Sequence, residues 1–160
     1  MFVFIGISPK EKGAYTILDT FLATSYETHE WNENTFLRNV DHVLSKRDPW
    51  QIKCFIESSS TNILDCNKIK DFLSSLDIQC QIISPQGWRK QFSLNNKDDK
   101  AVINAAKEFH AELGRWHPAP EIINKSEAAE SLMIACYAHL RDVANYWRKK
   151  RSQKEGVCSK

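Results

Sequence analysis

Four polar residues lie where apolar segments of this chain end or begin, which is where the side chains of α/β sites gather. Ser8 follows the apolar run that starts at Phe2, and Glu57 ends the run IKCFIE just before three serines. Glu127 and Glu130 are three residues apart at the start of an apolar segment, so they share one face of a helix. Carboxylates that converge in this way suit Mg²⁺. Two such ions, roughly 4 Å apart, activate a water and stabilise the leaving oxygen in phosphodiester cleavage.

Each of these acids also has an ordinary structural explanation. Glu57 is explained equally well as an exposed acid that begins a loop. Ser126 is a suitable N-cap, and the helix dipole favours Glu127 and Glu130 in the first turns. The segment after them is apolar on most sides, however, which predicts a buried helix that exposes carboxylates only at a rim or cleft.

Two basic segments are candidates for contacts to nucleic acid. Residues 84–100 combine an aromatic ring with cations, and the relevant residues are Trp88, Arg89, Lys90, Lys97 and Lys100. Residues 147–154 hold five of the 22 Lys and Arg residues and no acid; four of them are Arg148, Lys149, Lys150 and Arg151. Such runs suit contacts to phosphates, and they equally suit a solvated helix end.

Apolar periodicity predicts the elements that position these residues. Strands are expected over 2–7, 13–18, 23–31, 51–57 and 78–83, and helices over 34–45, 63–76, 86–92, 98–113 and 126–148. Three strands followed by alternating strands and helices predict an α/β fold. The expected architecture is a mixed five-stranded sheet with helices on both faces. Apolar residues of the helix within 62–76 serve either the sheet or a two-fold interface.

Composition sets broad limits. With 160 residues, 42% hydrophobic and 26% charged, the chain is expected to form one domain over 1–148, with a basic tail over 149–160. The net charge of +2 excludes a polycation, and no apolar run is long enough to span a bilayer. No secretory signal is expected. The five cysteines form no CxxC pair, so we expect neither disulfide nor zinc, and a cytoplasmic or other reducing compartment.

Four segments together resemble the RuvC family of Holliday-junction resolvases, which has the RNase H-like fold. FIGISPKEKGAYTIL resembles the opening strand, turn and second strand, usually IGIDPGxxGAxAxL, and KCFIESSS resembles the strand that ends in a catalytic Glu. IISPQGWRKQFSL is similar to a segment that reads roughly PQxWKKxxGL in relatives, and KSEAAESLMIACYAH resembles the closing acid pair followed by ALxIAxYG. The resemblance covers nearly the whole chain in the right order.

The resemblance implies a site residue by residue. Glu57 falls on the second metal-binding acid, and Glu127 and Glu130 fall on the last pair. The first acid, an aspartate that bridges both metals in the family, falls on Ser8, and the usual glycine of the turn falls on Lys10. A hydroxyl adds no charge and cannot fix the spacing of two ions, so four carboxylates become three. Asp19 lies too far along the hairpin to take the place of this aspartate, and Glu11, in the turn, has no matching place in the family pattern.

Three functions remain open at this stage. The first is a crossover-junction endodeoxyribonuclease that uses Mg²⁺ or Mn²⁺, binds branched DNA as a homodimer, and either tolerates Ser8 or recruits another acid. The second is an inactive relative that binds nucleic acid or serves as a subunit of a nucleoprotein assembly. The third is an α/β domain with no role in nucleic-acid chemistry, whose likeness is one of fold alone. No membrane and no small-molecule cofactor is expected in any of them.

Overall fold

A single five-stranded sheet organises the chain. The computed structural model describes residues 1–10, 12–21, 24–58, 65–113 and 120–157, without the side chains of residues 147 and 150–157. The strand order is β3-β2-β1-β4-β5. The strands are β1 (Val3–Ser8), β2 (Ala14–Asp19), β3 (Ser25–Glu30), β4 (Ile52–Glu57) and β5 (Gln79–Ile83). The α/β class and the number of strands predicted from the sequence are confirmed.

The sheet is mixed, with β1 at its centre. β1 pairs antiparallel with β2 and β2 antiparallel with β3, whereas β1, β4 and β5 run parallel to one another. All six residues of β1 are buried. This explains why its sequence is an almost continuous apolar run, since both of its faces are covered.

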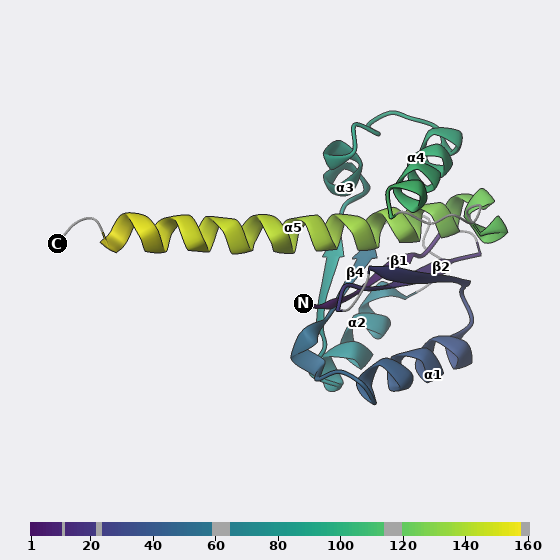
Figure 1. The fold of residues 1–160 in the computed structure, drawn as a ribbon. Helices are drawn as coiled ribbons and strands as arrows, with labels where there is room; N and C mark the ends of the chain where they lie inside the picture. The colour runs from purple at the N-terminus through teal and green to yellow at the C-terminus, as the bar shows by residue number, and fades with distance from the viewer. Residues whose placement is uncertain (11, 22–23, 59–64, 114–119, 158–160) are drawn as a thin grey trace.

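Helices cover both faces of the sheet, as predicted. In Figure 1, α1 and α2 lie below the sheet, and α3, α4 and α5 lie above it. The helices are α1 (Glu33–Leu44), α2 (Cys66–Ser75), α3 (Pro85–Gln91), α4 (Asp99–Glu112) and α5 (Ser126–Val157), with two short 3₁₀ segments, Pro49–Gln51 and Glu121–Asn124. Each face has its own apolar core, one formed with α1 and α2 and the other with α3, α4 and α5.

Polar caps fix where four helices begin. The side chains of Asn32, Asp65, Ser84 and Asp98 each accept a hydrogen bond from a backbone N–H in the first turn of the helix that follows. Such caps satisfy donors that have no partner inside the helix. Pro85 occupies the first turn of α3, as its sequence position predicted.

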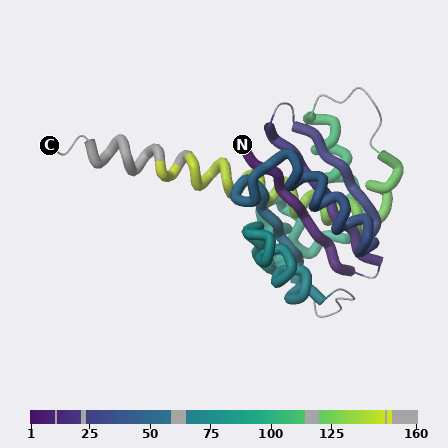
Figure 2. The backbone as a smooth tube through the Cα atoms, turned by 90° about the horizontal axis from the view of Figure 1, so that it is seen from below, coloured from purple at the N-terminus to yellow at the C-terminus, as the bar shows by residue number. Residues whose placement is uncertain are grey.

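Helix α5 is longer than predicted. It was expected to end at 148, but it continues to Val157. The residues from 147 to 155 are mostly Lys, Arg, Gln and Glu, which are good helix formers, and Gly156 is the first glycine in this stretch. The helix is buried up to Ala138, whereas Leu140, Val143 and Tyr146 are exposed. Its second half projects away from the body of the protein (Figure 2).

The apolar residues of α2 serve the core. Leu73 is buried, and Ile69, Phe72 and Leu76 pack against the cluster between α1, α2 and the sheet. Four cysteines lie among the described residues, at 54, 66, 80 and 136, and all four are free thiols. No helix in the described part of the chain is long and apolar enough to cross a membrane.

Candidate functional site

Ser8 and Glu57 lie at the same edge of the sheet. Each is the last residue of its strand, and β1 and β4 are parallel neighbours in a register that pairs Ile7 with Ile56. Both side chains are fully buried. The carboxyl ends of parallel strands therefore place a hydroxyl and a carboxylate side by side at the rim.

Glu130 reaches this edge because α5 crosses closely over β1. A Cβ atom added to Gly6 would lie 2.5 Å from the Ala135 nitrogen of α5 and in direct overlap with the Ser131 carbonyl oxygen. Only glycine leaves room for this approach, which brings the second turn of α5 against the strand. The three alanines Ala128, Ala129 and Ala135 are also buried there.

Both oxygens of the Glu130 carboxylate are engaged by donors. The Ser8 hydroxyl donates to Oε2 at 2.9 Å. The Lys10 ammonium and the Arg89 guanidinium both donate to Oε1, at 2.5 Å and 2.6 Å. Glu130 is fully buried, whereas the side chains of Lys10 and Arg89 are 31% and 15% exposed. A buried carboxylate paired with two cations is the arrangement that offsets its loss of hydration.

Glu57 has a different environment. The indole N–H of Trp88 donates to its Oε2 at 2.5 Å, and its Oε1 is buried with no hydrogen-bond partner. Burial raises the pKa of Glu57, and the charge of Glu130 raises it further. The Trp88 hydrogen bond and the charges of Lys10 and Arg89 act in the opposite direction on this pKa.

Among the contacts of the described residues, none links Glu127 to Ser8, Glu57 or Glu130, and its place in the site stays a prediction. Glu127 lies in the first turn of α5, half-buried, and the charged neighbour recorded for it is Lys125. Lys125 is itself hydrogen-bonded to Glu30 of β3. Glu30 pairs with Ala14, which pairs with Ser8, so this contact of Lys125 lies at the same end of the sheet as Ser8, two strands away on β3.

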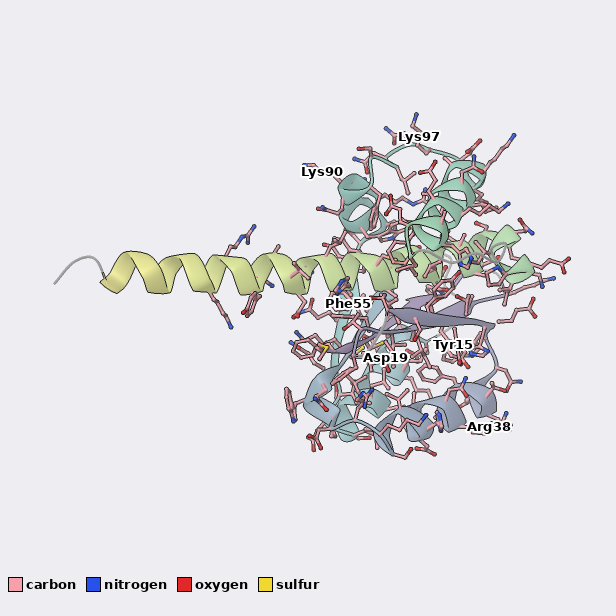
Figure 3. All side chains as sticks on the ribbon, in the orientation of Figure 1. Tyr15, Asp19, Arg38, Phe55, Lys90 and Lys97 are labelled. Carbon is pink, nitrogen blue, oxygen red and sulfur yellow. The ribbon has the colours of Figure 1, made fainter. Side chains whose placement is uncertain are left out.

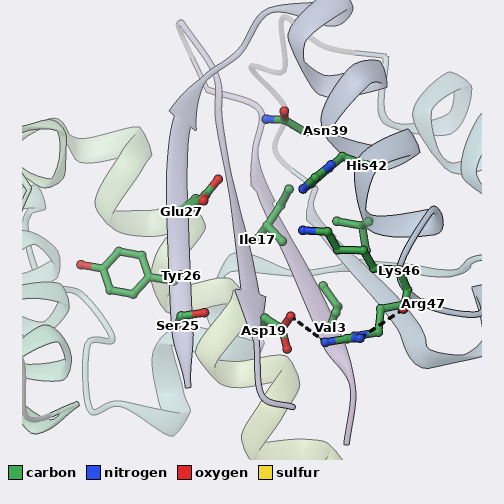
Figure 4. Close-up of a pocket in the computed structure, with 11 residues that line it drawn as sticks. Val3, Ile17, Asp19, Ser25, Tyr26, Glu27, Asn39, His42, Lys46 and Arg47 are labelled. Atoms are coloured by element: carbon green, nitrogen blue, oxygen red, sulfur yellow. Dashed lines mark hydrogen bonds and ion pairs between the residues drawn. The ribbon is translucent and has the colours of Figure 1, made fainter. Parts of the chain in front are cut away.

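Asp19 does not replace the missing aspartate. The register pairs Asp19 with Val3, at the opposite end of β1 from Ser8. Figure 4 shows it in a pocket of about 240 Å³ between α1 and the first three strands, paired with Arg47. Glu11, the other acid considered from the sequence, lies outside the described residues.

A cationic pocket opens over Glu57. It has a volume of about 510 Å³, and its lining includes Lys10, Arg89, Lys90, Asn95 and Asn96. Lys90, Asn95 and Asn96 are exposed, and Lys97 is exposed just beyond them. Figure 3 shows Lys90 and Lys97 pointing outward on the side of α3 and α4.

The structure separates the residues predicted to contact nucleic acid into three groups. Lys90, Lys97 and Lys100 are exposed near α3 and the start of α4. Arg148 and Lys149 are exposed on the projecting half of α5, while the side chains of Lys150 and Arg151 lie outside the described residues. The structure corrects the prediction that Trp88 contacts nucleic acid, because the ring of Trp88 is fully buried in the core and cannot stack on a base. Arg89 points inward to Glu130 and also donates to the backbone oxygen of Lys97.

Comparison with solved structures decides the fold. A structure of Thermus thermophilus RuvC matches this chain with a TM-score of 0.54, over 85% of this chain and 92% of the RuvC chain. The chain has the RuvC fold. At 13% sequence identity the match concerns the RNase H-like architecture alone, and it confirms the resemblance in that respect. No family model and no curated protein matches the sequence.

The RuvC fold implies Mg²⁺ at this edge, and the residues gathered here do not fit a pair of divalent ions. Two carboxylates meet, and one of them already accepts bonds from Ser8, Lys10 and Arg89. Over the described ranges, no group of three or more His, Cys, Asp and Glu side chains could hold a metal ion. Two divalent ions carry four positive charges and require more anionic oxygen than this.

Lys10 is the site residue to which no role was assigned from the sequence. The sequence did single out this position, because Lys10 occupies the place in the turn where the RuvC pattern has a glycine. A cation two residues after a strand end can reach the same rim as Ser8. Its pairing partner could not be read from the sequence, because Glu130 is 120 residues away.

Proposed function

We propose that this chain is a RuvC-like protein that binds branched DNA at the carboxyl edge of its sheet. The observation that carries the proposal is the pocket of about 510 Å³ over Glu57, which lies at the edge where RuvC-like folds place their chemistry and is lined by three cations. Phosphodiester oxygens are the anions that such a pocket suits, because each phosphate bears one charge and accepts several hydrogen bonds.

The lining supports contacts to a phosphate backbone. The Arg89 guanidinium and the Lys10 ammonium lie at the inner end of the pocket, and Lys90 lies at its exposed rim. The side-chain amides of Asn95 and Asn96 are further donors that suit phosphate or sugar oxygens. Lys97 and Lys100 extend the positive surface toward α4. A bent or branched duplex can approach such a rim with more than one arm.

Cleavage of the junction is the second candidate, and one observation favours it. The Oε1 oxygen of Glu57 is buried without a donor at the base of the cationic pocket. An unpaired buried carboxylate oxygen is costly and is typical of sites that act on a ligand. The pairing of Glu130 with two cations favours binding without hydrolysis, so DNA binding is the function proposed first.

The direct test is binding of a synthetic four-way junction and of a linear duplex of the same length. We expect tighter binding of the junction, with an affinity that falls steeply as salt rises, because each phosphate contact releases counterions. Incubation with Mg²⁺ or Mn²⁺ in the same experiment shows whether the junction is cut. Equal affinity for the two DNAs, or an affinity that is insensitive to salt, contradicts the proposal.

Charge reversal at the rim locates the interface. Lys90→Glu removes one attraction and adds one repulsion, so we expect roughly tenfold weaker binding to the junction. Lys46→Glu is the matched control, because Lys46 is also exposed but lies beyond α1 at the other end of the sheet. An equal loss in both variants would show a general charge effect and no site at this edge.

The homodimer implied by the resemblance remains a prediction. Light scattering of the purified chain, alone and with the junction, measures it directly. A dimer would let two copies of the pocket meet two arms of one junction, which is the symmetry that a four-way substrate favours.

A further inference from the structure

When Glu57 is ionised, the charges of the site balance without an added ion. Glu57 and Glu130 supply two carboxylates, and Lys10 and Arg89 supply two cations, one in the turn after β1 and the other in α3. We infer that the ammonium of Lys10 and the guanidinium of Arg89 take the place of divalent metal ions at this edge. The site therefore works without a metal, with phosphate as its ligand.

Geometry supports this substitution at Glu130. A metal ion needs a free lone pair directed at it, but both cations bind Oε1 within 2.6 Å and the Ser8 hydroxyl binds Oε2 at 2.9 Å, so three of the about four acceptor sites of the carboxylate are in use. Because Glu130 is fully buried, its hydrogen bonds cannot be exchanged for water. A divalent ion bound at the remaining site would lie close to the Lys10 ammonium and the Arg89 guanidinium, and each of these cations would repel it.

The turn after β1 supports the same conclusion independently. Among its described residues, Ser8, Pro9, Lys10 and Lys12, it supplies the site with one hydroxyl and one ammonium and no carboxylate. An anionic side chain at position 8 would attract cations to the edge, whereas the Ser8 hydroxyl donates a hydrogen bond to Glu130 and brings no charge. The described residues of this turn thus contribute positive charge where a metal site needs negative charge.

The substitution also directs the two cations toward the pocket. Lys10 and Arg89 are held by Glu130 on one side, and both line the pocket on the other. Fixed cations lose little freedom when an anion arrives, so Glu130 acts as a positioning residue for them. This last step rests on the proposed DNA binding, whereas the absence of metal binding does not.

The test is a titration of the full chain with Mn²⁺, in which electron paramagnetic resonance measures the free ion and no DNA is present. The unmodified chain should show no site with a dissociation constant below about 1 mM. The double variant Ser8→Asp with Lys10→Met adds a carboxylate and removes the ammonium, and we expect it to bind Mn²⁺ at least tenfold more tightly. Ser8→Asp with Lys12→Met is the matched control; Lys12 is exposed in the same turn, so this variant should gain much less.

Two results would overturn the inference. One is tight Mn²⁺ binding by the unmodified chain that disappears in Glu130→Gln. The other is junction binding that requires Mg²⁺ when the ionic strength is held constant. The first measurement uses the unmodified chain, so it decides the question even where a variant does not fold. If the unmodified chain binds neither the junction nor Mn²⁺, the proposed function is refuted, and the replacement of metal ions by Lys10 and Arg89 still stands.

Discussion

Replacing Trp88 with Phe tests whether the buried Glu57 is charged in the folded protein. The change removes the indole N–H that donates to Glu57 Oε2 and leaves both carboxylate oxygens without a donor. A hydrogen bond to a charged group contributes about 1.5–3 kcal/mol. The smaller ring adds about 1 kcal/mol of lost packing in the core. We therefore expect a loss of about 3 kcal/mol in the free energy of unfolding when Glu57 is ionised.

The loss should depend on pH, and its sign follows from the pKa of Glu57. Burial raises this pKa in the folded state, so the folded protein holds the proton more tightly than the unfolded chain and loses stability as pH rises through the folded value. The Trp88 hydrogen bond opposes that shift, so Trp88→Phe raises the pKa of Glu57 further. At about pH 8 the variant should show the full loss, and at about pH 4.5 a smaller loss, because a neutral carboxyl is a weaker acceptor for the indole N–H than a carboxylate.

Urea unfolding followed by circular dichroism measures these values without relying on tryptophan fluorescence. Glu57→Gln supplies the matched background, because its amide keeps the shape of the side chain and cannot ionise. In that background Trp88→Phe should cost the same at both pH values, about 2 kcal/mol for the packing and a neutral hydrogen bond together. A loss that is equal at both pH values with Glu57 present would refute the reasoning, since the indole would then not be stabilising a charge.

Two further predictions follow from the packing of α5 and from the cationic surface. Gly6→Ala should destabilise the fold by at least about 3 kcal/mol in urea unfolding, because the new Cβ overlaps the Ser131 carbonyl oxygen, whereas Gly87→Ala, which meets only a serine side chain at 3.3 Å, should have little effect. Equal effects would show that α5 can move away from β1. Lys97→Gln with Lys100→Gln should weaken binding to junction and duplex alike and reduce the salt slope by about 2 in fluorescence anisotropy; an unchanged slope would remove these two residues from the interface.

Much of the fold could be predicted because local pattern and tertiary structure agree in this chain. The strand from Val3 to Ser8 is apolar throughout because it is central and covered on both faces. A helix start is predictable where its cap and its first residues are neighbours in the sequence, as at Ser84 and Pro85. The end of α5 was not predictable from its charge, because a basic run suits a helix and a solvated tail equally well.

The site was only partly predictable, because its pairings are long-range. Ser8, Glu57 and Glu130 were selected as strand ends and helix starts, and these three meet. Glu127 shares the sequence motif of Glu130, but the charged neighbour that the structure gives it is Lys125, which is bonded to Glu30 of β3. The segment around Trp88 has the composition of a nucleic-acid contact, but Trp88 itself is a buried core residue. Only the packing of α3 shows which of these two roles its ring has.

Because α5 is a single unbroken helix, it fixes the distance between the candidate site and the basic residues near its end. Glu130 and Arg148 lie on the same helix, 18 residues apart. At 1.5 Å per residue they are separated by about 27 Å, and no linker can vary that separation. A duplex arm that touched both the pocket over Glu57 and the projecting part of α5 would have its two contacts about eight base-pair steps apart. The helix would then favour arms that leave the branch point at the right distance and angle, whatever their sequence.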